Sequence, residues 1–195
     1  MKMILPFILF VVIVYKDVMN RNRYFKEIEE YIPKFSNVLD FGAGRCELAT
    51  YLKNRNYVTS VDIYRGCKDA DVYDGYTLPY VDGAFDVVVC MFVLHHIPHH
   101  RKIIEELKRV CAKRIIIIED MPETFYQYFI SKLHYLFFKQ PMHTIENMHS
   151  PDIWCNLLED EGRCFLKKLS SHSFINPTPH FLIVKDLKPM RGGRV

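Results

Sequence analysis

The most constraining feature of the 195-residue sequence is a short apolar run that ends at a glycine turn. Residues 38–41 read V-L-D-F, which is the length of a short buried strand, and Gly42, Ala43 and Gly44 follow at once. Apolar residues then recur at helical spacing, at positions 48, 51 and 52. A strand, a glycine turn and a helix in this order predict the start of a βαβ unit that binds a nucleotide or a cofactor.

Strand-like and helix-like segments continue to alternate after this unit. Strands are expected at residues 38–41, 57–63, 69–74, 85–91 and 115–118, and helices lie between several of them. The unbroken apolar runs at 85–91 and 115–118 are typical of parallel strands that are covered on both faces. The pattern predicts an α/β fold, a doubly wound and mostly parallel sheet with helices on both faces. Right-handed crossovers place the carboxyl ends of such strands along one edge, where ligands bind.

The residues around the turn discriminate between classes of ligand. No Gly-Lys-Ser/Thr follows the glycines, which excludes a phosphate-loop nucleotide site. The third glycine of a dinucleotide turn would fall at Glu47, and Asp40 would face a pyrophosphate with like charge. S-adenosylmethionine has no phosphate and matches better. It offers Asp40 an ammonium, and it offers Asp62, which lies 22 residues further on, two ribose hydroxyls.

Four motifs in order resemble those of class I S-adenosylmethionine-dependent methyltransferases. They are V-L-D-F-G-A-G at 38–44, S-V-D-I at 60–63, D-G-Y-T-L-P-Y-V-D-G-A-F-D-V-V-V-C at 74–90, and L-H-H-I at 94–97. The resemblance covers residues 24–120 and is to the broad methyltransferase-domain group, which acts largely on small molecules. It implies a Rossmann-like methyltransferase fold with a seven-stranded sheet, an antiparallel last strand and S-adenosylmethionine as cofactor.

The resemblance also implies roles for individual residues. Asp40, Gly42, Ala43 and Gly44 would hold the methionine end, Asp62 the ribose, Ile63 the adenine ring and Asp74 the adenine amino group, with Cys90 and Met91 beneath the sulfonium. The family's third glycine is replaced by Cys46. Three interpretations of this side chain are open: it tightens the site, weakens cofactor affinity, or points into the core.

A histidine cluster follows the fourth strand, at positions 95, 96, 99 and 100. Pro98 interrupts the helix that would bring two of these rings onto one face, and no further ligand completes a set, so no metal site is predicted. His95 or His96 could act as a general base, because histidine titrates near neutral pH, and His95 is the candidate; capping of a backbone group would explain one of them equally well.

These assignments predict in-line transfer of a methyl group to a small-molecule acceptor. A base is needed only if the acceptor must lose a proton. The alternative is a methyltransferase-like binding or scaffold protein without turnover, which Cys46 and the small substrate region favour. An NAD-linked oxidoreductase has little support. A net charge of +3, without a basic stripe interleaved with aromatic residues, argues against a nucleic-acid partner.

The six cysteines contain no Cys-x-x-Cys pair, and several fall on predicted buried faces. A reduced, intracellular and cytoplasmic chain is therefore expected, without a disulfide framework. The sequence does not indicate an oligomeric state.

Three segments are expected: a hydrophobic segment at 1–18, the S-adenosylmethionine-binding methyltransferase domain at 19–187, and a basic tail at 188–195. Between Met3 and Tyr15 there is no charged residue. At ~1.5 Å per residue this run covers about 20 Å, less than the ~30 Å hydrocarbon core of a bilayer. It is interpreted as a short membrane anchor, as a leader packed on the domain, or as an extension upstream of a working start at Met19.

Overall fold

The computed structural model describes residues 22–137, 147–158, 162–169 and 178–188. The apolar run between Met3 and Tyr15 lies outside the described residues, as does the tail from residue 189 onward, so the membrane contact inferred for that run stays a prediction. No helix of the described part combines the length and the apolar character that crossing a membrane requires.

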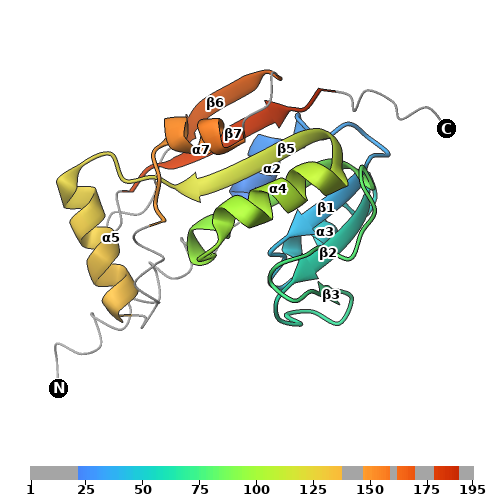
Figure 1. The fold of residues 1–195 in the computed structure, drawn as a ribbon, viewed down its shortest axis with the longest axis horizontal. Coiled ribbons are helices and arrows are strands. Elements are labelled where there is room, and N and C mark those ends of the chain that lie inside the picture. The colour runs from blue at the N-terminus through green and yellow to red at the C-terminus, as the bar shows by residue number, and fades with distance from the viewer. Residues whose placement is uncertain (1–21, 138–146, 159–161, 170–177, 189–195) are drawn as a thin grey trace.

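Seven strands form one sheet in the order β3-β2-β1-β4-β5-β7-β6 (Figure 1). Their bounds are β1 Asn37–Phe41, β2 Tyr57–Asp62, β3 Asp71–Val72, β4 Phe85–Met91, β5 Cys111–Asp120, β6 Cys164–Leu169 and β7 His180–Asp186. The first five strands are parallel, and β7 runs antiparallel to both β5 and β6. The predicted fold class is therefore confirmed, including the antiparallel last strand.

Helices cover both faces of this sheet. They are α2 Asn22–Glu29, α3 Glu47–Leu52, α4 His100–Val110, α5 Phe125–Phe137 and α7 Pro151–Leu157, with a short 3-10 turn, η1, at Leu94–His96. Because side chains alternate along a strand, β4 contributes to two separate cores. Val89 and Met91 pack with α2 and α3, whereas Val88 and Cys90 pack with α4 and α7. The strands β4 and β5 read as unbroken apolar runs in the sequence because both faces of the sheet are buried at these strands.

The seam between α4 and α7 contains a cluster of three rings. His100 opens α4, Trp154 lies on α7, and His149 precedes α7. The Nε2 atoms of the two histidines are 3.2 Å apart, and the ring centroids of both histidines lie within 5.5 Å of that of the fully buried Trp154. Burial lowers the pKa of His100 and of His149. The seam is therefore built around imidazoles that favour the neutral form.

The glycine turn after β1 requires its first glycine. Gly42 has a φ of 71°, and a Cβ there would lie 2.3 Å from Cγ2 of Val93 in the loop after β4. Gly44 also has a positive φ, of 52°, but no other atom lies within 4 Å of the position that its Cβ would take. Gly42 is thus a packing requirement, whereas Gly44 leaves open space at the turn.

Cys46 and Cys67 form a disulfide, so the expectation of a chain without disulfides is wrong at this pair. Cys46 precedes α3, and Cys67 lies in the connection between β2 and β3, which is only eight residues long. Crossovers between parallel strands usually need a dozen or more residues and a helix. Cross-links that close loops of about 15 to 100 residues stabilise a fold by roughly 3 to 5 kcal/mol, which helps to hold this short crossover in place.

Candidate functional site

The carboxylate of Asp40, the penultimate residue of β1, lies in the interior at the base of the glycine turn. It is 4% exposed, and the hydroxyl of Ser60 donates to its Oδ2 atom over 3.5 Å. A cavity of about 10 Å³ opens beside it; its lining is Phe25, Asp40, Gly42, Ala43, Glu47, Leu48 and Met91. The structure thus brings together four of the predicted cofactor residues. Ligand pockets usually measure ~300–1,000 Å³, so this cavity alone is too small for a ligand of that size.

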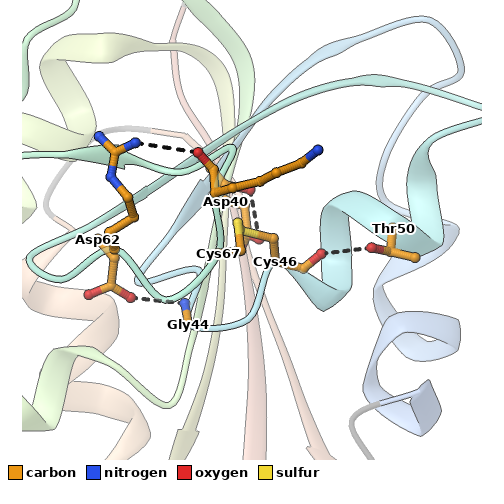
Figure 2. Close-up of a disulfide and its surroundings, with 9 residues drawn as sticks. Asp40, Gly44, Cys46, Thr50, Asp62 and Cys67 are labelled. Atoms are coloured by element: carbon orange, nitrogen blue, oxygen red, sulfur yellow. Dashed lines mark hydrogen bonds between the residues drawn. A yellow bond between two sulfur atoms is a disulfide. The ribbon is translucent and has the colours of Figure 1, made fainter.

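Asp62 connects the end of β2 to the glycine turn (Figure 2). Its Oδ2 atom accepts a hydrogen bond from the backbone N–H of Gly44 at 2.9 Å, and its Oδ1 atom accepts one from Ile63 at 2.7 Å. These two bonds orient the carboxylate at the carboxyl edge of the sheet. Because a carboxylate has about four acceptor sites, capacity remains for ligand hydroxyls.

The predicted adenine-side residues lie next to one another in two loops. The Cγ2 atom of Ile63 is 3.8 Å from the position that a Cβ on Gly75 would take, directly after Asp74. Asp74 accepts hydrogen bonds from the backbone N–H groups of Thr77 and Tyr76, at 2.7 and 2.8 Å, and these bonds lower the pKa of its carboxyl group. Ile63 and Asp74 are both solvent-exposed, so this end of the site is open.

Cys90 does not reach the cavity beside the turn. Neighbouring residues on a strand point to opposite faces, so Cys90 and Met91 cannot both line one floor. Met91 lines the cavity, whereas Cys90 is fully buried in the core that packs under α4. Burial raises the pKa of the Cys90 thiol well above its ordinary value. The role of Cys90 beneath the sulfonium, which the resemblance implies, stays a prediction.

His95 lies inside the protein, in contact with Glu119 at the end of β5. The side chain is 2% exposed, and its Nδ1 atom is hydrogen-bonded to Oε2 of Glu119. Burial by itself lowers the pKa of His95, but the charge and the hydrogen bond of Glu119 outweigh it and hold the pKa above its ordinary value. Its role as a general base stays a prediction, and the observed contacts are those of a residue that positions the loop after β4.

A second polar group at the same edge was not predicted. His180 begins β7 opposite Asp120 at the end of β5, and its Nε2 atom is 2.9 Å from Oδ1 of Asp120. Its Nδ1 atom is 2.5 Å from the hydroxyl of Tyr24 on α2. The ring of Phe92, which follows β4, packs edge-on against both Tyr24 and His180. The acidic residues Glu119 and Asp120 at the end of β5 were the only indication of this group in the sequence. His180 is remote in sequence from Tyr24, Phe92 and Asp120, so no local motif includes it.

A larger cavity, of about 500 Å³, lies elsewhere, between α4 and α7. Its lining includes Arg101, Lys102 and Lys108, and no strand contributes to it. It does not contain any of the strand-end carboxylates, so it is not the site that the glycine turn forms. Within the described ranges there is no group of three or more histidine, cysteine or acidic side chains placed to hold a metal ion.

The fold and the turn define a protein of the class I methyltransferase type, and the comparisons agree. A sequence model of the methyltransferase-domain family matches residues 18–163, which is more than half of the chain. The chain therefore belongs to the methyltransferase-domain family, as the motifs predicted. No curated protein matches the sequence.

Solved structures with the same fold share little sequence with the chain. A methyltransferase from Aquifex aeolicus, described as SAM-dependent, is 20% identical with a TM-score of 0.59, over 84% of this chain and 88% of that one. A second SAM-dependent methyltransferase, from Methanosarcina mazei, is 16% identical with a TM-score of 0.59, over 84% and 97%. The (4+2)-cyclase SpnF is 13% identical with a TM-score of 0.66, over 86% and 81%. At these identities the likeness establishes the fold, and the fold alone does not specify one reaction.

Proposed function

We propose that this enzyme transfers the methyl group of S-adenosylmethionine to a small organic acceptor at the carboxyl edge of the sheet. The observation that carries the proposal is the pairing of the buried Asp40 with a glycine turn whose second glycine is tied to Asp62. Methyltransferases described as SAM-dependent share the fold. When bound, the cofactor supplies a methyl group on a positively charged sulfur, and the protein aligns the acceptor and excludes water.

The residues at the turn fit such a cofactor. Asp40 is an anionic partner for an ammonium in a buried position, where charge-assisted hydrogen bonds are strong. The open space beside Gly44 allows a carboxylate to approach the backbone of the turn. Asp62, Ile63 and Asp74 then form a continuous path along the ends of β2 and β3, with Met91 below the methionine end.

We propose the edge between β4 and β7 as the acceptor side. Phe92 is half-buried there and packs against the buried Tyr24, and His180 is held by contacts on both of its nitrogens. His180 is 14% exposed, whereas His95 is 2% exposed, so His180 is the nearer of the two to solvent. Both of its nitrogens are engaged, so its exchange of a proton with an acceptor requires that Tyr24 or Asp120 be released first.

Isothermal titration of the purified chain with S-adenosylmethionine, and with its demethylated product, tests the cofactor. Asp40→Asn should weaken binding by about 10- to 100-fold, because a charge-assisted hydrogen bond is worth about 1.5–3 kcal/mol. Asp86→Asn is the matched control. Asp86 lies at the opposite edge of the sheet, accepts from the backbone N–H of Asn37 at 2.9 Å, and should leave the affinity unchanged.

The outcomes separate the hypotheses. If neither compound binds, the proposal is refuted. If both bind, but no methyl group is transferred from a labelled donor to any component of a cell extract, the protein is the binding or scaffold protein of the alternative hypothesis. Equal losses in Asp40→Asn and Asp86→Asn would mean that Asp40 contributes only to the fold.

A further inference from the structure

The Cys46–Cys67 disulfide joins two segments that carry predicted cofactor residues (Figure 2). One is the glycine turn, and the other is the connection at residues 63–70 between β2 and β3. We propose that this pair is a redox-modification site: the enzyme binds its cofactor tightly when the disulfide is formed and more weakly when it is reduced. The inference rests on the binding of S-adenosylmethionine at the turn, as proposed above.

Cys46 occupies a backbone conformation that favours glycine. Its φ and ψ are 57° and 36°, in the left-handed region that residues with a Cβ rarely adopt. Its side chain is buried with Ala43 and Ala70, and its carbonyl accepts a hydrogen bond from the hydroxyl of Thr50 at 3.1 Å. The disulfide is thus one of a few contacts that hold an unfavourable conformation in place. The reduced turn has less to oppose its relaxation.

The connection that carries Cys67 has little regular structure of its own. Residues 63–70 contain no helix, and both residues of β3 are exposed. Gly66 packs directly on the turn, since a Cβ there would lie 2.0 Å from the carbonyl oxygen of Gly44. Ala70 adds an apolar contact to Ala43 and Cys46. The disulfide is the covalent member of this set, so its reduction should loosen the connection more than the rest of the domain.

Loosening matters because both segments carry predicted cofactor contacts. Gly44, on the turn, donates to the Oδ2 atom of Asp62, and Asp62 is the residue immediately before the connection. With the disulfide formed, turn and connection are fixed relative to each other before any ligand arrives. Without it, the cofactor must order both segments on binding, and that ordering subtracts from its affinity.

The chemistry of the switch is thiol–disulfide exchange with a dithiol reductant such as dithiothreitol. A thiolate of the reductant attacks the sulfur of Cys67, which is the more accessible of the two, and Cys46 leaves as a thiolate. The second thiol of the reductant then closes a cyclic disulfide. Two electrons pass from the reductant to the protein, and protonation leaves two thiols at Cys46 and Cys67.

The test is a titration of the full chain with S-adenosylmethionine in the oxidised and in the dithiothreitol-reduced state. Reduction should weaken binding by about tenfold, which is the ordering cost of one or two side chains. Cys67→Ser should show the weaker affinity in both states. The control is the Cys155→Ser/Cys164→Ser double variant, which removes a free thiol pair with sulfurs 2.8 Å apart on α7 and β6, and which should respond as the unmodified chain does.

Two further measurements keep the outcomes distinct. Far-ultraviolet circular dichroism must show that the reduced chain stays folded, because global unfolding on reduction would overturn the claim of a local effect. An affinity that is equal or tighter in the reduced state would overturn it as well. If no cofactor binds in either state, the proposed function fails. Amide hydrogen exchange then tests the effect of the disulfide by itself. Residues 44–46 and 63–70 must exchange faster on reduction, and unchanged exchange refutes the inference.

Discussion

Glu119 and His95 form a buried pair that ties the end of β5 to the loop after β4. One carboxylate oxygen of Glu119 accepts the backbone N–H groups of Leu94 and Val93, at 2.7 and 3.0 Å, and the other is bonded to Nδ1 of His95. Val93 in turn fills the space beside Gly42 in the glycine turn. A single carboxylate therefore sets the position of a loop that contacts the predicted cofactor site.

Replacement of Glu119 should be among the most damaging single changes. Glu119→Ala removes the partner of two backbone donors and one imidazole in the interior, and we expect a loss of about 3–5 kcal/mol in the free energy of unfolding. Urea denaturation measures it. Glu105→Ala is the control, because Glu105 is exposed and its ion pair with Lys108 lies at the surface of one helix. Its effect should stay within about 0.5 kcal/mol. Comparable losses of unfolding free energy in the two variants would show that the buried Glu119–His95 pair stabilises the fold no more than a surface ion pair does.

The two glycines of the turn should respond differently to alanine. Gly42→Ala forces a Cβ against Val93 and also strains a positive φ, whereas Gly44→Ala meets open space and bears the strain alone. We expect roughly 1–2 kcal/mol for Gly44→Ala and at least about 1 kcal/mol more for Gly42→Ala. Thermal and urea unfolding of both variants decide the matter. Cofactor affinity should show the opposite order: if the ligand contacts the open side of Gly44, Gly44→Ala should weaken binding more than Gly42→Ala does.

The α4–α7 seam should weaken in mild acid. The pKa values of His100 and His149 lie below the ordinary value of 6.5, so the folded state binds fewer protons than the unfolded state as the pH falls. Stability is therefore retained above about pH 6.5 and decreases below it, by at most about 1.4 kcal/mol per pH unit for each histidine. Urea midpoints measured from pH 8 to pH 5 should show this decline. His149→Gln should flatten it, and an unchanged slope would contradict the assignment.

The acceptor side can be located by comparing two histidines. If His180 exchanges a proton with the acceptor, His180→Gln should lower kcat by about 10²–10⁴-fold, with cofactor affinity unchanged. His95→Gln should act mainly through stability and KM, because His95 faces Glu119 in the interior. The opposite pattern would assign the base to His95. Loss of cofactor binding in His180→Gln would show that its role is structural.

The sheet could be predicted from sequence because its strands are apolar on both faces. Residues 85–91 were expected as one strand and form β4 over the same bounds. The strand predicted at 115–118 is longer in the structure, because β5 begins at Cys111 and includes the charged Lys113 and Arg114. Their side chains reach Asp86 and Asp186 at the edge of the sheet, and tertiary contacts of this kind leave no periodic signal.

The sequence predicts which residues meet at the carboxyl edge of the sheet where their position follows from the parallel topology. Asp40, Gly42 and Met91 do line one cavity, because the turn and the strand ends follow from the parallel topology. The Cys46–Cys67 bond was not foreseen, since only the unusually short crossover brings the two cysteines together. The contact of His180 with Asp120 depends on the antiparallel register of β7, which the sequence pattern does not determine.

Trp154 is the single tryptophan of the chain, and it is fully buried between His100 and His149. Indole emission is sensitive to solvent and is quenched by a neighbouring imidazolium. The tryptophan emission of this protein, excited selectively at the red edge where its tyrosines do not absorb, therefore originates at one known position, the seam between two helices, and needs no label. A red shift would record separation of α7 from the sheet, and quenching without a shift would record protonation of the flanking rings.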